Sequence, residues 1–134
     1  METIRLVTWV DAPVERCFKL SLSVDLHLEA LRKTRERAVD GVTTGLIGAG
    51  ETVKWSGRHF GRRWSHTSVV DAYRPFLFFR DVMVKGAFKH FEHEHHFAAL
   101  DDGTRIREEI RFSAPMGLLG RLAEKAFLDR KSVV

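Results

Sequence analysis

A chain of 134 residues, 44% of them hydrophobic, can bury one core, and we expect residues 1–134 to form a single domain. The formal charge is only +4, and the 22 basic residues are interspersed with 18 acidic ones, which indicates a solvated surface and no nucleic-acid partner. The single cysteine, Cys17, excludes a framework of internal disulfide bonds and suits a reducing compartment.

The first thirty residues predict a strand followed by two short helices. In "TIRLVTWV" (3–10) side chains of different character alternate, as they do in strands. Pro13 suits the first turn of a helix that runs to about Leu20, and Asp25 can begin a second helix that ends near Leu31. The chain has neither a signal-peptide layout at its start nor an apolar run of the ~18 residues that cross a membrane. We therefore expect a cytoplasmic protein that does not insert into membranes.

The rest of the chain predicts a run of strands and then one more helix. A short strand mixed with glycines lies in 36–50, and turn residues such as "LDDGT" separate longer strands at about 51–60, 64–73, 76–85, 88–99 and 104–114. After Pro115 and Gly117, one apolar face of a C-terminal amphipathic helix comprises Leu119, Leu122, Ala123, Ala126 and Phe127. Helices kept apart from a run of strands predict the α+β class. A long antiparallel sheet must curl around its helix, and the gap between them is a natural place for an apolar ligand.

Strand alternation then assigns side chains to the inner face of the sheet. One row of the last strand is apolar except for Glu108, and it comprises Ile106, Glu108, Ile110, Phe112 and Ala114. In "KHFEHEHHF" (89–97) the two glutamates predict a row facing water, which places the other row inward: Phe91, His93, His95 and Phe97. The same test places Val53, Trp55, Gly57 and His59 inward. Alternation leaves the direction of Asp81 open, because both faces of its strand are largely apolar.

A carboxylate inside an apolar row needs a partner, because the burial of an isolated charge is very costly. The turn at 101–103 makes the last two strands neighbours, so Glu108 can contact His93 or His95. Three interpretations follow. The residues can form a hydrogen-bonded pair that stabilises the wall, or they can orient the carbonyl or hydroxyl group of a ligand. They can also form an enzymatic site, in which a histidine held by Glu108 transfers a proton or the two histidines bind zinc together with His59 or Glu108.

Five stretches, in order and over nearly the whole chain, resemble one known superfamily: "DAPVERCFKLSLSVDLHLEAL", "ERAVDGVTTGLIGAGETVKW", "RHFG", "VKGAFKHFEHEHHF" and "GTRIREEIRFSAPMGLLGRL". The chain is similar to small bacterial members of the START-like (SRPBCC, helix-grip) superfamily, in the polyketide cyclase/dehydrase and lipid-transport-like group. The resemblance implies a sheet of about seven antiparallel strands around a C-terminal helix, with an apolar cavity between them. Relatives usually carry Asp where Glu108 stands, and their C-terminal helix usually continues beyond "DRKSVV". A more open cavity or coverage by a second copy of the chain, a homodimer, is therefore implied.

We predict a START-like domain that binds a small hydrophobic molecule, such as a lipid, a polyketide or an aromatic metabolite, and that has no cofactor. The ligand-binding residues that we expect are Trp55, His59, Phe91, His93, His95, Phe97, Glu108, Ile110 and Phe112. The alternative is an enzyme, either cyclase-like or metal-dependent, that uses the interior histidines and Glu108. The sequence assigns no catalytic residue and no metal ligand.

Overall fold

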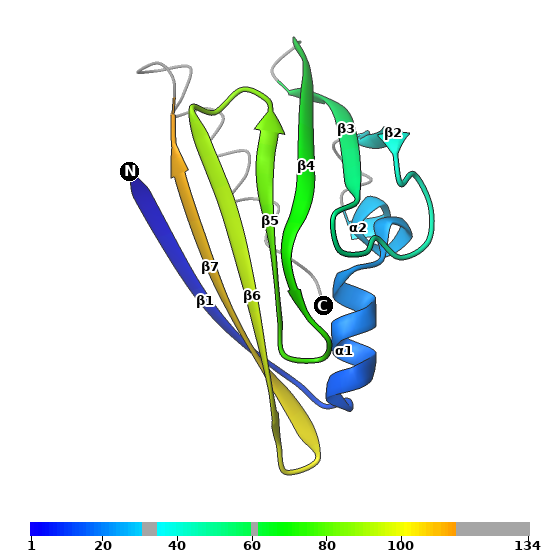
Figure 1. The fold of residues 1–134 in the computed structure, drawn as a ribbon, viewed down its shortest axis with the longest axis vertical. Coiled ribbons are helices and arrows are strands. Elements are labelled where there is room, and N and C mark those ends of the chain that lie inside the picture. Colours follow the sequence, from blue (N-terminus) through cyan, green and yellow to red (C-terminus); the bar gives the residue numbers. More distant parts are fainter. Residues whose placement is uncertain (31–34, 60–61, 115–134) are drawn as a thin grey trace.

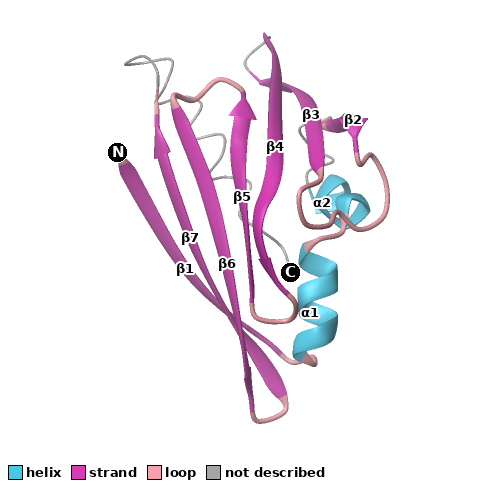
Figure 2. Cartoon of the chain, in the orientation of Figure 1, coloured by secondary structure: helices cyan, strands magenta, loops and turns pink. Residues whose placement is uncertain are grey.

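In the computed structural model, which describes residues 1–30, 35–59 and 62–114, seven strands form one antiparallel sheet. Its strand order is β1-β7-β6-β5-β4-β3-β2 (Figure 1). The strands are β1 (Glu2–Val10), β2 (Arg37–Gly41), β3 (Thr52–His59), β4 (Arg62–Arg74), β5 (Phe78–Lys85), β6 (His90–Leu100) and β7 (Gly103–Ser113). Two helices, α1 (Val14–Ser21) and α2 (Val24–Ala30), follow β1 and lie at the side of β3 and β4 (Figure 2).

This arrangement confirms the predicted α+β class, the seven-stranded antiparallel sheet and the two short helices after the first strand. The predicted C-terminal helix falls within 115–134 and lies outside the described residues. Within the described ranges, neither helix is long and apolar enough to span a lipid bilayer.

The second helix begins differently from the prediction. We expected Asp25 to begin α2, but the hydroxyl group of Ser23 accepts a hydrogen bond from the backbone N–H of Leu26 at 3.1 Å and caps the first turn. Asp25 lies within the first turn, and its carboxylate accepts a hydrogen bond from the backbone N–H of Gly45 at 2.9 Å. Asp25 therefore ties the helix to the loop before β3.

Helix α1 packs its apolar side on one face of the sheet, which we call the inner face. Phe18 is 1% exposed, and its ring meets the rings of four other aromatic residues edge-on, at centroid distances of 5.2–5.7 Å: Tyr73, Phe76, Phe79 and Phe97. Cys17 is also fully buried, as expected of a small apolar residue. This aromatic cluster fixes α1 against β4, β5 and β6.

Two apolar clusters therefore occupy the inner face. The first surrounds Phe18 and includes Val70, Phe79, Phe97 and Ile106, and the second comprises Phe91, Ile110 and Phe112. Pairing irregularities in β4, between Thr67 and Ser68 and between Val70 and Ala72, change which residues of β4 and β5 lie opposite each other. Strands β5, β6 and β7 contribute to both clusters, and they also carry four polar residues on this face: Asp81, His93, His95 and Glu108.

Candidate functional site

The inner face carries the row of β7 that alternation predicted. Ile106, Glu108, Ile110 and Phe112 are all at most 4% exposed, whereas Arg105 and Arg107 are exposed. Phe91, His95 and Phe97 of β6 are buried as well, and His93 is half-buried. The structure therefore places the interior histidines and Glu108 on one face.

Glu108 contacts both histidines, but not in the way that strand pairing alone suggests. It lies opposite His95 in the β6–β7 register, and yet its carboxylate accepts a hydrogen bond from His93 Nε2 at 2.9 Å. The same oxygen, Oε1, is 3.6 Å from His95 Nδ1. The side chain of Glu108 is 2% exposed, so the two imidazoles take the place of water around this carboxylate.

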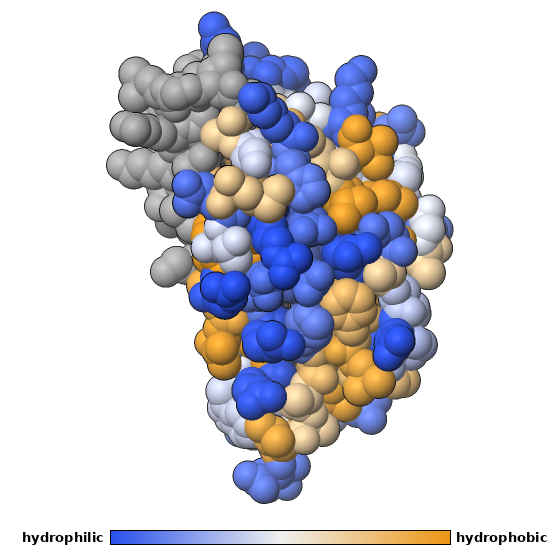
Figure 3. Space-filling view, turned by 60° about the vertical axis from the view of Figure 1, so that its left-hand side comes forward, coloured by the Kyte–Doolittle hydropathy of each residue, from blue (hydrophilic) through white to orange (hydrophobic). Residues whose placement is uncertain are grey.

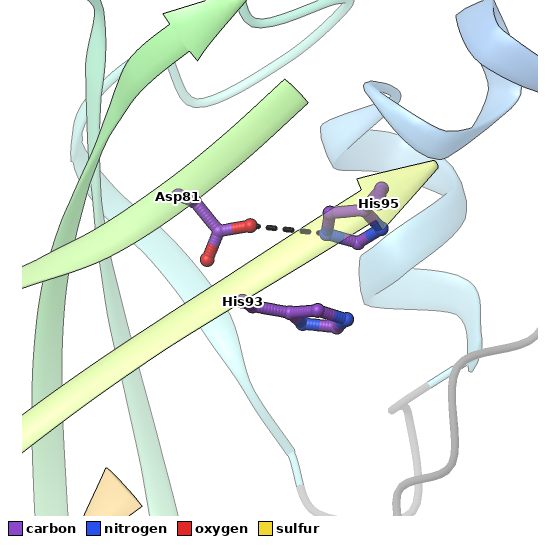
Figure 4. A group of neighbouring side chains, drawn as sticks. All are labelled: Asp81, His93 and His95. Atoms are coloured by element: carbon purple, nitrogen blue, oxygen red, sulfur yellow. Dashed lines mark hydrogen bonds and ion pairs between the residues drawn. The ribbon is translucent and has the colours of Figure 1, made fainter. Parts of the chain in front are cut away.

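Asp81 completes the group from the other side of β6. It lies opposite His93 in the β5–β6 register, but its Oδ2 is 3.2 Å from Nε2 of His95 (Figure 4). Each carboxylate thus reaches past the histidine opposite it to the next histidine along β6. We call Asp81, His93, His95 and Glu108 the polar cluster.

Stacked rings hold the two histidines in place. The imidazoles of His93 and His95 are stacked with their centroids 3.8 Å apart, and the ring of Phe79 stacks on His95 at 4.0 Å. The two rings therefore lie one on the other between the two carboxylates, with Phe79 on the far side of His95.

The charges of the polar cluster follow from its burial. Burial raises the pKa of Asp81, but the hydrogen bond with His95 and attraction to His93, His95 and His66 together hold this pKa below its usual value. Burial lowers the pKa of His95, and repulsion from His93 lowers it further, against the opposing effects of Asp81 and Glu108. Near neutral pH, a neutral His95 therefore donates its Nε2–H to an ionised Asp81.

No family model matches the chain, and no curated protein matches its sequence. Solved structures match closely in shape. Ara h 8.0201 superposes with a TM-score of 0.70 at 14% identity, over 96% of this chain and 89% of that one. Major latex-like protein 151 of Panax ginseng gives a TM-score of 0.57 at 12% identity, over 96% and 93%. CalU16 of Micromonospora echinospora gives 0.56 at 16% identity, over 96% and 72%.

The chain has the helix-grip fold. The match confirms, at the level of the fold, the resemblance to START-like (SRPBCC) proteins that the sequence indicated. In this helix-grip protein the polar cluster lies on the face of the sheet that carries α1 and the aromatic clusters.

Of the nine residues predicted for the site, three belong to the polar cluster (His93, His95 and Glu108) and four are buried on the same face (Phe91, Phe97, Ile110 and Phe112). Trp55 is half-buried and packs on His27 of α2, with ring centroids 4.3 Å apart. It lies on β3, which β4 and β5 separate from β6. The side chain of His59 lies outside the described part of the structure, so its predicted role stays a prediction.

Two residues on the inner face were not identified from the sequence. Asp81 was left without a direction, and His66 was not considered. His66 lies opposite Trp55 in the β3–β4 register, and its ring meets Phe91 edge-on at 5.2 Å. The alternation of Trp64, His66, Ser68 and Val70 with their neighbours was the signal for His66, but both rows of β4 are too mixed for this signal to be decisive.

The opposite, outer face of the sheet is held by ion pairs. Arg111 binds Glu109 at 2.6 Å and Glu92 at 3.3 Å, and Arg80 binds Asp71 at 2.9 Å. A space-filling view shows hydrophilic residues gathered across the middle of one side of the molecule, with hydrophobic patches beside them (Figure 3). These ion pairs connect charged side chains on the outer face, whereas the polar cluster lies among apolar and aromatic residues on the inner face.

Proposed function

We propose that this protein binds a small hydrophobic molecule on the inner face of the sheet, and that the polar cluster orients it. The observation that carries the proposal is the set of two carboxylates and two imidazoles within a largely apolar and aromatic face. Ligand sites for apolar molecules typically combine such a face with a few fixed polar groups. The helix-grip fold, which other ligand-binding proteins share, supports the proposal at the level of the superfamily.

The members of the polar cluster differ in how a ligand can reach them. The side chain of Asp81 is 25% exposed, compared with 12% for His93, 10% for His95 and 2% for Glu108. A hydroxyl or N–H group of a ligand would therefore donate to Asp81. Glu108 would not contact the ligand. It would be a positioning residue that holds the imidazoles of His93 and His95.

The apolar part of the ligand would lie on the aromatic and aliphatic side chains that flank the polar cluster: Phe91, Phe97, Ile110 and Phe112. Trp55 would extend this surface towards α2, because His66, which lies opposite Trp55 in the β3–β4 register, meets Phe91. A lipid, a polyketide or an aromatic metabolite has the required combination of an apolar body and one polar end.

A second candidate function is proton transfer of the cyclase type. It is favoured by the hydrogen bond between Asp81 and His95, because a carboxylate that is held by an imidazole and is 25% exposed can act as a general base towards a bound substrate. Asp81→Asn would then abolish turnover of a bound substrate and leave its affinity within about threefold. An equal loss of affinity and turnover would instead return Asp81 to a binding role.

Native mass spectrometry tests the binding proposal directly. Protein purified under gentle conditions should carry a small apolar molecule, seen as a mass excess over the denatured chain, and fresh apolar ligand should restore the excess after extraction. Native and denatured masses that agree, together with no uptake from a mixture of fatty acids and aromatic ketones, would contradict the proposal.

A further inference from the structure

Three members of the polar cluster are arranged like the ligands of one metal ion. Asp81, His93 and His95 each offer one ligand atom, and the three atoms lie within 4.8 Å of one another (Figure 4). Two ligands in a tetrahedral zinc site, each about 2.0–2.1 Å from the ion, are about 3.3 Å apart. The 3.2 Å between Asp81 Oδ2 and His95 Nε2 matches this separation.

The position of His95 between two carboxylates is a second observation. Its Nε2 faces Asp81 at 3.2 Å and its Nδ1 faces Glu108 at 3.6 Å. A metal ion between Nε2 and Asp81 would accept one electron pair from each, and Nδ1–H would then donate to Glu108.

Glu108 is placed to support two metal-binding imidazoles. Metal-bound histidines usually donate their second N–H to a carboxylate or carbonyl oxygen, which fixes the ring and its tautomer. The buried Oε1 of Glu108 lies 2.9 Å from His93 Nε2 and 3.6 Å from His95 Nδ1. With both N–H groups directed at Glu108, His93 Nδ1 and His95 Nε2 would be the ligand atoms, and one of the two stacked rings would turn to bring both lone pairs to a single ion.

We propose that Asp81, His93 and His95 form a binding site for a divalent first-row transition-metal ion, with Glu108 supporting the two imidazoles. Two imidazoles and one carboxylate suit Zn²⁺ or Fe²⁺, and not Mg²⁺ or Ca²⁺, which prefer oxygen ligands. Three protein ligands leave a coordination position open. At that position the ion would polarise a carbonyl or hydroxyl group of a molecule on the inner face.

The proposal is tested by titrating chelator-treated protein with Zn²⁺ alone and measuring the heat of binding by isothermal titration calorimetry. We expect one ion per chain and a higher Tm in its presence, because an ion that binds only the folded chain stabilises it. Co²⁺ should give the visible absorption of a four- or five-coordinate site. Asp81→Asn and His95→Gln should each weaken Zn²⁺ binding at least about tenfold, and Glu108→Gln about 10- to 100-fold.

His96→Gln is the matched control, because His96 is the neighbour of His95 on β6 but lies on the outer face, bonded to Glu94 at 3.0 Å. It should bind Zn²⁺ as the unchanged protein does. Absence of saturable Zn²⁺ binding to the unchanged protein would overturn the proposal. Equal affinity in Asp81→Asn, or a loss in His96→Gln as large as in His95→Gln, would do the same.

Two further measurements keep the outcome unambiguous. Far-ultraviolet circular dichroism shows whether each variant folds, and Asp81→Asn, at the most exposed member of the cluster, remains informative if the variants of the more buried residues do not fold. Uptake of apolar ligand measured in EDTA separates this inference from the proposed function. Uptake without Zn²⁺ binding would overturn the metal site alone, and Zn²⁺ binding without uptake would overturn the ligand proposal alone.

Discussion

Glu108 lies opposite His95 across the β6–β7 pair, but the imidazole that it binds at 2.9 Å is that of His93. Asp81 shows the converse on the other side of β6, opposite His93 and hydrogen-bonded to His95 at 3.2 Å. These two diagonal side-chain contacts connect β5, β6 and β7 in addition to the backbone hydrogen bonds of the sheet. The polar cluster therefore contributes to the sheet as well as to a candidate site, and its two roles can be separated by experiment.

Replacement of Glu108 by Gln should destabilise the protein. The variant keeps the shape of the side chain but removes the charge that His93 and His95 share, and we expect the free energy of unfolding to fall by about 1–3 kcal/mol. Urea denaturation in EDTA measures this loss. Glu109→Gln is the matched control, because Glu109 is the next residue but faces outward, paired with Arg111. A loss in Glu109→Gln as large as in Glu108→Gln would contradict the account.

Acidification should destabilise the protein through His95. The pKa of His95 is below its ordinary value of 6.5 in the folded chain, chiefly because of burial and then because of His93, with Asp81 and Glu108 opposing. The unfolded chain therefore takes up a proton first as the pH falls below about 6.5, and stability is lost until the pH passes the folded pKa. His95→Gln should remove this part of the pH dependence between about pH 8 and 5.5.

The comparison requires unfolding curves for the unchanged protein, His95→Gln and His96→Gln at both pH values in EDTA. His96→Gln should keep the dependence on pH, because His96 lies on the outer face. The same slope in His95→Gln and the unchanged protein would show that the acid sensitivity originates elsewhere.

Phe18 should be a principal anchor of α1. Its ring is 1% exposed and meets four aromatic rings edge-on. Phe18→Leu should lower the free energy of unfolding by about 1–3 kcal/mol, since it leaves a cavity among these rings. Phe78→Leu is the control, because Phe78 is half-buried and packs on His96. If thermal melts show the Phe78 variant to be at least as destabilised, α1 is not held by the aromatic cluster in the way described.

Asp81 should give the site a preference for ligands that carry a hydroxyl group. We expect the protein to bind 2-naphthol about three- to tenfold more tightly than 2-methylnaphthalene, as one hydrogen bond to the half-buried carboxylate of Asp81 would provide. Asp81→Leu keeps the branched shape of the side chain but removes its hydrogen-bonding oxygens, and it should remove the preference. Asp71→Leu, on the outer face and paired with Arg80, should retain it. Fluorescence titration gives the six affinities, and an equal preference in Asp81→Leu would contradict the assignment of Asp81.

The sequence predicted those parts of the site in which one face of a strand is clearly charged. Arg105, Arg107 and Arg111 marked the outer face of β7, and Glu92 and Glu94 marked that of β6. The inward direction of Glu108, His93 and His95 followed from this contrast. The class of the fold followed from the order of helices and strands.

The remaining parts depended on relations that alternation does not contain. Both faces of β5 are largely apolar, and the irregularity between Val70 and Ala72 shifts its pairing with β4, so alternation does not determine the direction of Asp81. The diagonal contacts also depend on the register of β5 against β6. For the same reason the third ligand of a metal site was sought at His59 or Glu108, whereas the geometry brings Asp81 to the two histidines.

The histidines of β6 offer the most direct test of the central claim, that the inner face is the ligand site. His93 and His95 face inward, and His90 and His96 on the same strand face outward. Ring-nitrogen NMR spectra recorded during titration with 2-naphthol should show shifts for His93 and His95 and none for His90 and His96. Shifts confined to the outward pair, or no shift at a saturating concentration, would contradict the account.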